Sequence, residues 1–412
     1  MTASNRNRRL LEALWRALAP AAPRLLTQLE RDPDSPLFGC FDRDHWHYKM
    51  RDFASAILQQ GAVSLDALAA LDLPDNPLFA SPRTEQWSRA AVRCLARLQR
   101  PSGGYDEYYP REQGFPPAAF GLYAAGLFFA RRGWPAPEPG VAAALQRCAD
   151  WLLAHQETEA LNQECAALAG LALAGRVPGL AVDPDRLARR WDDFYAAQAP
   201  GGWFPEYGGP DTGYLSVTLD CLYDAHRVNN DPRAPEAMRR AAAFIAELVL
   251  PDGRVPAMAN ARNTDYIAPY GLTRLGATDP TAAAVVHALF AGADQPWHFL
   301  NATDDRYLCH YLFQSAFRAL EHMDRLGEPG ELPRDRACER FDAEAGLYVR
   351  HEGGAAGRSL VFAGAKGGVC YLAGPGGVED ADFGWRAGLP GGKLAVTHWP
   401  SPDWDTALER GT

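Results

Sequence analysis

The segment GGWFPEYGGPDTGYLSVTLD, residues 201–220, gathers the side chains best suited to acid–base chemistry. It contains Glu206, Tyr207, Asp211 and Tyr214, and the apolar spacing that follows predicts a helix beginning near Tyr214. A tyrosine at the start of a helix could exchange a proton with a ligand if a nearby cation lowered its pKa from about 10. The alternative is that both tyrosines only pack and donate hydrogen bonds, as amphipathic aromatic residues commonly do.

A second group lies in PDGRVPAMANARNTDYIAPYG, residues 251–271, which reads as a loop between two helices. It holds Asn260, Arg262, Asn263, Asp265 and Tyr266. The guanidinium fork of an arginine matches the two oxygens of a carboxylate, so Arg262 is a candidate clamp for an acidic ligand. The alternative is a structural loop held by Asn and Asp turn bonds. We favour ligand binding.

The segment FGCFDRDHWHYKMRDF, residues 38–53, carries the densest local positive charge of the chain. Its candidate ligand contacts are Arg43, His45, His47 and Tyr48. Two histidines two residues apart share a face only on a strand, and no third metal ligand accompanies them, so we expect no metal. The segment is interpreted either as a cleft rim that binds an acidic or hydroxyl-rich ligand or as a packed N-terminal segment.

Two shorter motifs complete the candidate residues. LNQECAALAGLALAG, residues 161–175, places Asn162 at the start of a buried helix, where it either contacts a ligand or caps the helix. GGYDEYYPREQGF, residues 103–115, offers Tyr105 beside Asp106 and Glu107. Aromatic rings next to carboxylates suit the faces and hydroxyls of a sugar, and they also suit an ordinary loop.

These motifs need a scaffold, and apolar residues at helical spacing supply it up to about residue 335. Helices are expected over 87–98, 140–155, 164–174, 215–228 and 235–250. Four of the helices end in related turns, several rich in glycine, at 98–109, 155–164, 197–208 and 248–260. Repeated helical hairpins bury their faces against one another, which predicts a ring. The residues after each turn would then surround one mouth of that ring.

The pattern changes after residue 335. Short segments at 345–352, 358–365, 367–374, 382–389 and 392–399 are separated by glycine and rich in Val, Leu and aromatic residues. They are predicted to be strands of one small antiparallel sheet. The expected fold is therefore mainly α, with an (α/α) toroid, incomplete or of six hairpins, over residues 1–335. A short antiparallel β-unit over residues 336–412 follows it.

Composition narrows the functional classes. The 412 residues include 41 Lys and Arg against 51 Asp and Glu, a net charge of −10, which disfavours nucleic-acid binding. The eight cysteines form no CxxC pair, as expected of free thiols in a reducing compartment. No apolar run reaches membrane-spanning length, and the N-terminus does not read as a signal peptide. We expect a cytoplasmic protein without a membrane span and without a cofactor; the oligomeric state is left open.

Together these features resemble the heparinase II/III-like polysaccharide lyases, in which an (α/α) toroid is joined to a β-sandwich. The resemblance rests on the helical hairpins with aromatic turns and on the Gly-rich unit that begins AGLYVRHE. Asn162 lies where the family has an Asn that neutralises a uronate carboxylate, and Tyr214 resembles the family's catalytic tyrosine. PDGRVPAMAN resembles the stretch that follows the tyrosine helix. The chain departs from the family in having Gln163 after the Asn and no recognisable β-domain His motif.

The resemblance implies β-elimination at a uronic acid within an acidic polysaccharide or oligosaccharide. Asn162 and Arg262 would neutralise the carboxylate and stabilise the enediolate. Tyr214 would remove the C5 proton, protonate the leaving oxygen, or do both. If Tyr214 performs one step only, His45 or His47 would supply the base.

Three other functions compete with this one. A glycoside hydrolase needs two carboxylates about 5 to 9.5 Å apart, for which Asp106, Glu107, Glu206 and Asp211 are available. A non-catalytic toroid could bind glycan or support polysaccharide biosynthesis. A terpenoid cyclase is disfavoured because the chain lacks a DxDD motif.

Overall fold

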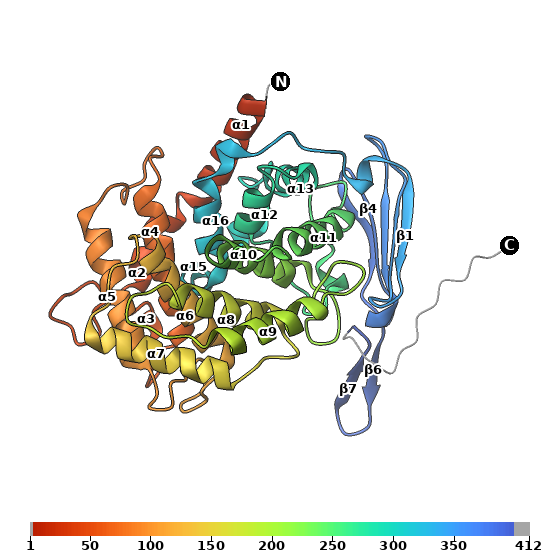
Figure 1. The fold of residues 1–412 in the computed structure, drawn as a ribbon. Coiled ribbons are helices and arrows are strands. Elements are labelled where there is room, and N and C mark those ends of the chain that lie inside the picture. Colours follow the sequence, from red (N-terminus) through yellow and green to blue (C-terminus); the bar gives the residue numbers. More distant parts are fainter. Residues whose placement is uncertain (1–2, 399–412) are drawn as a thin grey trace.

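The computed structural model describes residues 3–398, which form a body of helices flanked at one edge by a small antiparallel sheet (Figure 1). The helices occupy the first four-fifths of the chain, and the strands follow them. This arrangement confirms the expected fold class, a mainly α toroid followed by a small β-unit.

Six inner helices form a closed ring: α4 (Gly61–Ala70), α6 (Phe115–Ala130), α8 (Leu161–Ala174), α10 (Thr212–Asn229), α12 (Pro269–Leu275) and α16 (Tyr311–Leu320). Each packs against the next, and α16 packs against α4 to close the circle. Every residue of α8 except Gln163 is buried. Such a helix has no solvent face, so the ring is stable only inside a second layer of helices.

The outer layer is built from α1 (Ala3–Leu18), α5 (Pro82–Leu98), α7 (Pro139–Ala154), α9 (Pro184–Ala196), α11 (Ala234–Glu247) and α13 (Pro280–Phe290). Each of these helices packs on a helix of the ring, and all but α13, which has almost no exposed residue, are amphipathic. The helices expected over 87–98, 140–155, 164–174, 215–228 and 235–250 correspond to α5, α7, α8, α10 and α11. Shorter helices are α2 (Ala21–Gln28), α3 (Arg43–Trp46), α14 (Phe299–Ala302) and α15 (Asp305–Cys309).

The turns after α5 and α9 share one construction. The amide nitrogen of Gln99 donates to the carbonyl of Gly103 at 3.1 Å, and that of Gln198 donates to the carbonyl of Gly202 at 2.9 Å. Both glycines have positive φ and lie so close to a neighbouring carbonyl that a Cβ would approach it to 2.3 Å. Only glycine fits there, and the chain then reverses toward the next inner helix.

The sheet is a meander in the order β1-β2-β3-β4-β5: β1 (Cys338–Asp342), β2 (Leu347–His351), β3 (Ser359–Ala363), β4 (Val369–Gly374) and β5 (Gly377–Asp382). The strands expected at 345–352, 358–365 and 367–374 are β2 to β4. The single-sheet prediction was wrong, because 382–389 and 392–399 contribute β6 (Arg386–Leu389) and β7 (Lys393–Val396), a separate hairpin. Residues 399–412 of the expected β-unit lie outside the described part.

The two strands that the sequence did not reveal are the edges of the sheet. CERFD in β1 and GVEDAD in β5 lack apolar alternation because edge strands leave much of their surface to solvent. The central strands alternate instead, with Leu347 and Val349 buried toward the helices. Edge strands with alternating apolar residues could have been predicted from the sequence, but β1 and β5 are too polar to show that alternation.

The sheet is fastened to the end of α11 and the loop that follows it. His351 bonds through Nε2 to the carbonyl of Glu247 at 3.0 Å, and the hydroxyl of Tyr371 accepts from the backbone N–H of Met258 at 3.0 Å. These bonds hold in place the same loop that carries Arg262. Among residues 3–398, no helix combines the length and apolarity needed to cross a membrane.

Candidate functional site

A cavity of about 240 Å³ opens at the end of the ring where the inner helices begin. We call it the mouth cavity. Its lining comes mainly from the turns that precede inner helices and from the first residues of those helices. The polar and aromatic lining residues are Glu107, Tyr108, Phe120, Asn162, Gln163, Tyr207, Tyr214, Arg262, Tyr266, Arg306, Tyr307, His310 and Tyr311.

The three residues predicted to be catalytic, Asn162, Tyr214 and Arg262, all line this cavity. They come from the start of α8, the first turn of α10 and the loop before α12. Asp211 links the last two: one carboxylate oxygen caps α10 through the N–H of Tyr214 at 3.1 Å. The other accepts from the N–H of Arg262 at 3.0 Å. A single buried carboxylate therefore fixes two of the three backbones.

Two acceptors beside the cavity are buried without a hydrogen-bond partner in the described part of the chain: Oδ1 of Asn162 and Oε1 of Glu206. Asn162 does not cap α8, because Ala160 occupies the cap position. Burial, followed by the charge of Asp211, raises the pKa of Glu206 well above its usual value. Buried polar atoms are nearly always paired, so such orphans indicate a missing partner.

The hydroxyl of Tyr214 is held in its protonated form. Burial raises its pKa above the usual tyrosine range, and the charges of Asp211 and Glu206 act in the same direction. Its ring lies edge-on to Tyr266, with centroids 6.2 Å apart. A tyrosine that acts as a base needs a lowered pKa, and this site raises the pKa of Tyr214 instead. Tyr214 is therefore better suited to donate a proton.

Sequence reasoning missed one wall of the cavity, formed by Arg306, Tyr307 and His310 around α15. Burial and the charge of Arg306 lower the pKa of His310 to about 3, so its ring is neutral near pH 7. Its Nδ1 is buried and unpartnered among residues 3–398. The motif DDRYLCHYLF could have revealed this wall, since polar and aromatic residues directly precede an inner helix there as in the other turns.

The N-terminal candidates separate in space. Arg43 and Tyr48, with the guanidinium centre 4.9 Å from the ring centroid, line a neighbouring pocket of about 210 Å³ that shares Arg306 with the mouth cavity. His45 and His47 line neither cavity. The α3 helix turns the two histidines apart, and Nδ1 of His45 is bonded to the carbonyl of Arg51 at 2.9 Å.

Several predicted binding residues have internal roles. Tyr105 is fully buried behind the mouth and cannot touch a ligand, because the turn at Gly103 folds its ring into the core. The side-chain amide of Asn260 is engaged within the fold: its oxygen accepts from the N–H of Thr212, and its nitrogen donates to the carbonyl of Thr264 at 2.7 Å. Asn263 lines an adjoining pocket, where its side-chain oxygen accepts from Lys366.

The carboxylate pair needed by a hydrolase does not gather at the mouth. Of the four candidates, only Glu107 lines the cavity, and it is bonded to Arg306 at 2.6 Å. Asp106 is engaged by Arg100 and by backbone N–H groups, and Asp211 by the backbones described above. Within the described residues, no cluster of three or more His, Cys, Asp or Glu side chains could hold a metal ion.

Comparisons with known proteins support the fold alone. No protein-family model matches the chain, and neither does any curated protein. Among solved structures, a Paenibacillus xanthan lyase has a TM-score of 0.50 at 14% identity, with 85% of this chain and 34% of that one covered. Heparinase III has a TM-score of 0.49 at 12% identity, with 82% of this chain and 52% of that one covered. A sugar epimerase from a ruminal bacterium has a TM-score of 0.49 at 12% identity, with 69% of this chain and 86% of that one covered. These neighbours are (α/α)-toroid proteins, and the chain spans only about a third of the xanthan lyase.

Proposed function

We propose that the mouth cavity binds a uronic acid of an acidic polysaccharide or oligosaccharide and that the protein cleaves the glycosidic bond by β-elimination. One observation carries the proposal. A protonated tyrosine, an amide with an unsatisfied oxygen and an arginine line the same cavity of about 240 Å³. This set matches the needs of an elimination at a carbon next to a carboxylate.

The carboxylate is the first need. The C5 proton of a uronate becomes acidic only if the charge that develops on the carboxyl group is stabilised. Arg262 offers a bidentate fork at the rim, where its guanidinium centre lies 4.6 Å from the ring centroid of Tyr207. The amide N–H₂ of Asn162 can donate to the same group, while its unsatisfied oxygen accepts from a sugar hydroxyl.

The two proton transfers use an imidazole that is unprotonated and a tyrosine hydroxyl that is protonated near pH 7. Burial and the charge of Arg306 hold the pKa of His310 at about 3, so its imidazole becomes an effective base only when the carboxylate of the bound uronate offsets that charge. It then accepts the C5 proton, and the C5 electrons form the C4=C5 double bond. The C4–O bond breaks, and the departing oxygen takes its proton from the hydroxyl of Tyr214. This division replaces the expectation that Tyr214 does both steps or that His45 or His47 supplies the base, since neither of those histidines lines the cavity.

The test is ultraviolet absorbance during incubation with a panel of uronate polymers and oligomers, because elimination creates a conjugated unsaturated uronide. We expect a rise that falls by at least ~100-fold in both Tyr214→Phe and His310→Gln. Tyr195→Phe is the matched control, a tyrosine of α9 that packs on Trp191 outside the cavity. New reducing ends without absorbance would indicate hydrolysis. Binding without any new ends would indicate a non-catalytic glycan-binding toroid.

A further inference from the structure

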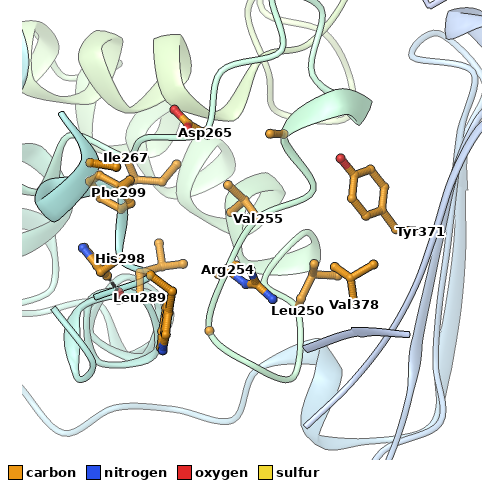
Figure 2. Close-up of a pocket in the computed structure, with 14 residues that line it drawn as sticks. Leu250, Arg254, Val255, Asp265, Ile267, Leu289, His298, Phe299, Tyr371 and Val378 are labelled. Carbon is orange, nitrogen blue, oxygen red and sulfur yellow. Dashed lines mark hydrogen bonds between the residues drawn. The ribbon is translucent and has the colours of Figure 1, made fainter. Parts of the chain in front are cut away.

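A second cavity, of about 260 Å³, lies between the sheet and the toroid (Figure 2). Tyr371 and Val378 face it from the sheet, and Leu289, His298 and Phe299 from the opposite side. Most of its remaining lining is also apolar, including Leu250, Val255, Ile267 and Trp297. We call it the junction pocket.

Apart from Asp265, which the junction pocket shares with a neighbouring cavity, the polar groups in its wall are already engaged. Burial lowers the pKa of His298 to about 4, and its neutral ring bonds the carbonyl of Leu289 at 3.0 Å and the N–H of Leu300 at 3.3 Å. Arg254 is paired with Asp252 at 2.6 Å. Tyr371 uses its hydroxyl to accept from a backbone N–H. A wall of this kind favours an apolar occupant, in contrast to the mouth cavity with its orphaned polar atoms.

An intermediate cavity of about 260 Å³ adjoins both the junction pocket and the mouth cavity. The intermediate cavity shares Asp265, Phe299 and Ala302 with the junction pocket. It shares Tyr214, Arg262, Tyr266 and Tyr307 with the mouth cavity. A ligand whose sugar contacts Tyr214 would reach the apolar pocket by extending a substituent across the intermediate cavity and past Asp265.

We propose that the junction pocket binds an apolar substituent, an alkyl or aryl group, carried by the sugar that lies in the mouth cavity. An apolar cavity of about 150 Å³ is large enough for benzene, so the junction pocket has room for a ring or a short chain. This inference deepens the proposed function and rests on it for the position of the sugar. It adds a specificity for amphiphilic glycosides over plain oligosaccharides.

Calorimetric binding of four glycosides tests the inference: methyl and hexyl glucuronide, and methyl and hexyl glucoside. Since each buried methylene adds roughly threefold to fourfold in affinity, we expect hexyl glucuronide to bind at least about tenfold more tightly than methyl glucuronide. Val378→Trp, from the sheet side, and Val255→Trp, from the loop side, would fill the pocket and remove that preference. Leu389→Trp, an exposed site on β6 away from the pocket, would keep it.

The four ligands separate this inference from the uronate proposal. Equal affinity of methyl and hexyl compounds in both pairs would overturn the junction pocket as a binding site and leave the uronate site standing. A hexyl preference that survives both filling variants would also overturn it, because the chain would then bind elsewhere. A third outcome is that both filling variants lose the hexyl preference but glucosides bind as tightly as glucuronides. That outcome would support the junction pocket and contradict uronate recognition.

Discussion

Two polar clusters lie one above the other in the toroid, and they are built from the same residue types. The upper one is the mouth cavity. The lower one, here the deep cluster, is formed by Tyr123, Asp220, Asp224, Tyr270, Tyr311 and Arg318 from four inner helices. Tyr311 belongs to both, because it lines the cavity and donates to Asp220 at 3.1 Å.

The deep cluster is saturated by its own members. Asp224 accepts from the hydroxyls of Tyr123 at 2.5 Å and Tyr270 at 3.2 Å and pairs with Arg318. The guanidinium centre of Arg318 also lies 3.6 Å from the ring centroid of Tyr270. A fully hydrogen-bonded network of this kind fixes the inner helices in one arrangement and leaves no donor or acceptor free to bind a ligand.

The mouth cavity has the opposite character. Asn162 and His310 in its lining each have a buried atom without a partner among residues 3–398, and so does Glu206 beside it. Residue type does not distinguish the two clusters, since both contain tyrosine, arginine and carboxylate. The two clusters differ in how completely their polar atoms are hydrogen-bonded. The saturated cluster stabilises the fold, whereas the unsaturated one is arranged to receive a ligand.

The largest effect should come from breaking the deep cluster. Arg318→Met leaves Asp224 buried without its ion pair, so we expect the free energy of unfolding to fall by about 3 to 5 kcal/mol. Tyr214→Phe at the mouth should change it by less than about 1 kcal/mol. Urea unfolding of both variants measures the two values. Similar losses in both would show that the clusters do not differ as described.

The next effect depends on pH. Burial raises the pKa of Asp220 from 3.8 to about 6, so the folded protein keeps a proton that the unfolded chain releases near pH 4. The stability from this carboxyl group is therefore fully present below pH 3.8 and is lost as pH rises through 6. Asp220→Asn does not titrate. Between about pH 4 and pH 7 its stability should rise relative to the wild type by ~3 kcal/mol.

Urea titrations of the wild type and Asp220→Asn at several pH values measure that difference. Replacing the carboxylate also weakens the bonds from Gly271 and Tyr311, so the variant starts from a lower baseline. The slope of the difference with pH, rather than its absolute value, is the readout. Parallel curves would mean that Asp220 ionises in the fold as easily as in the unfolded chain.

The sequence predicted the scaffold better than the site. Helical spacing and the glycine turns are local signals, so they indicated the hairpins and a ring whose turns surround one mouth. Only the structure brings Asn162, Tyr214 and Arg262 together at one cavity. Burial and hydrogen-bond saturation depend on contacts between distant segments. That is why Tyr105 and Asn260 looked like ligand contacts, and why His310 was missed. The role of Asp224 is invisible for the same reason, because its partners lie on α6, α12 and α16.

The smallest but sharpest effect compares two asparagines. Asn162 has an orphaned oxygen, whereas Asn260 bonds Thr212 and Thr264 with both ends of its amide. Asn162→Leu removes an unsatisfied polar atom, so we expect stability to stay level or rise by about 1 kcal/mol. Asn260→Leu leaves several groups unpaired and should lower stability by about 2 kcal/mol. Urea unfolding measures both.

Binding then gives the second half of this comparison. Asn162→Leu should weaken methyl glucuronide binding at least about tenfold while the protein remains as stable as the wild type, because the amide meets the ligand and not the fold. A loss of stability in Asn162→Leu as large as that in Asn260→Leu would mean that the amide of Asn162 is bonded within the fold. Asn162 would then belong with the saturated deep cluster, and the mouth cavity would lose the orphaned oxygen on which its assignment as a ligand site rests.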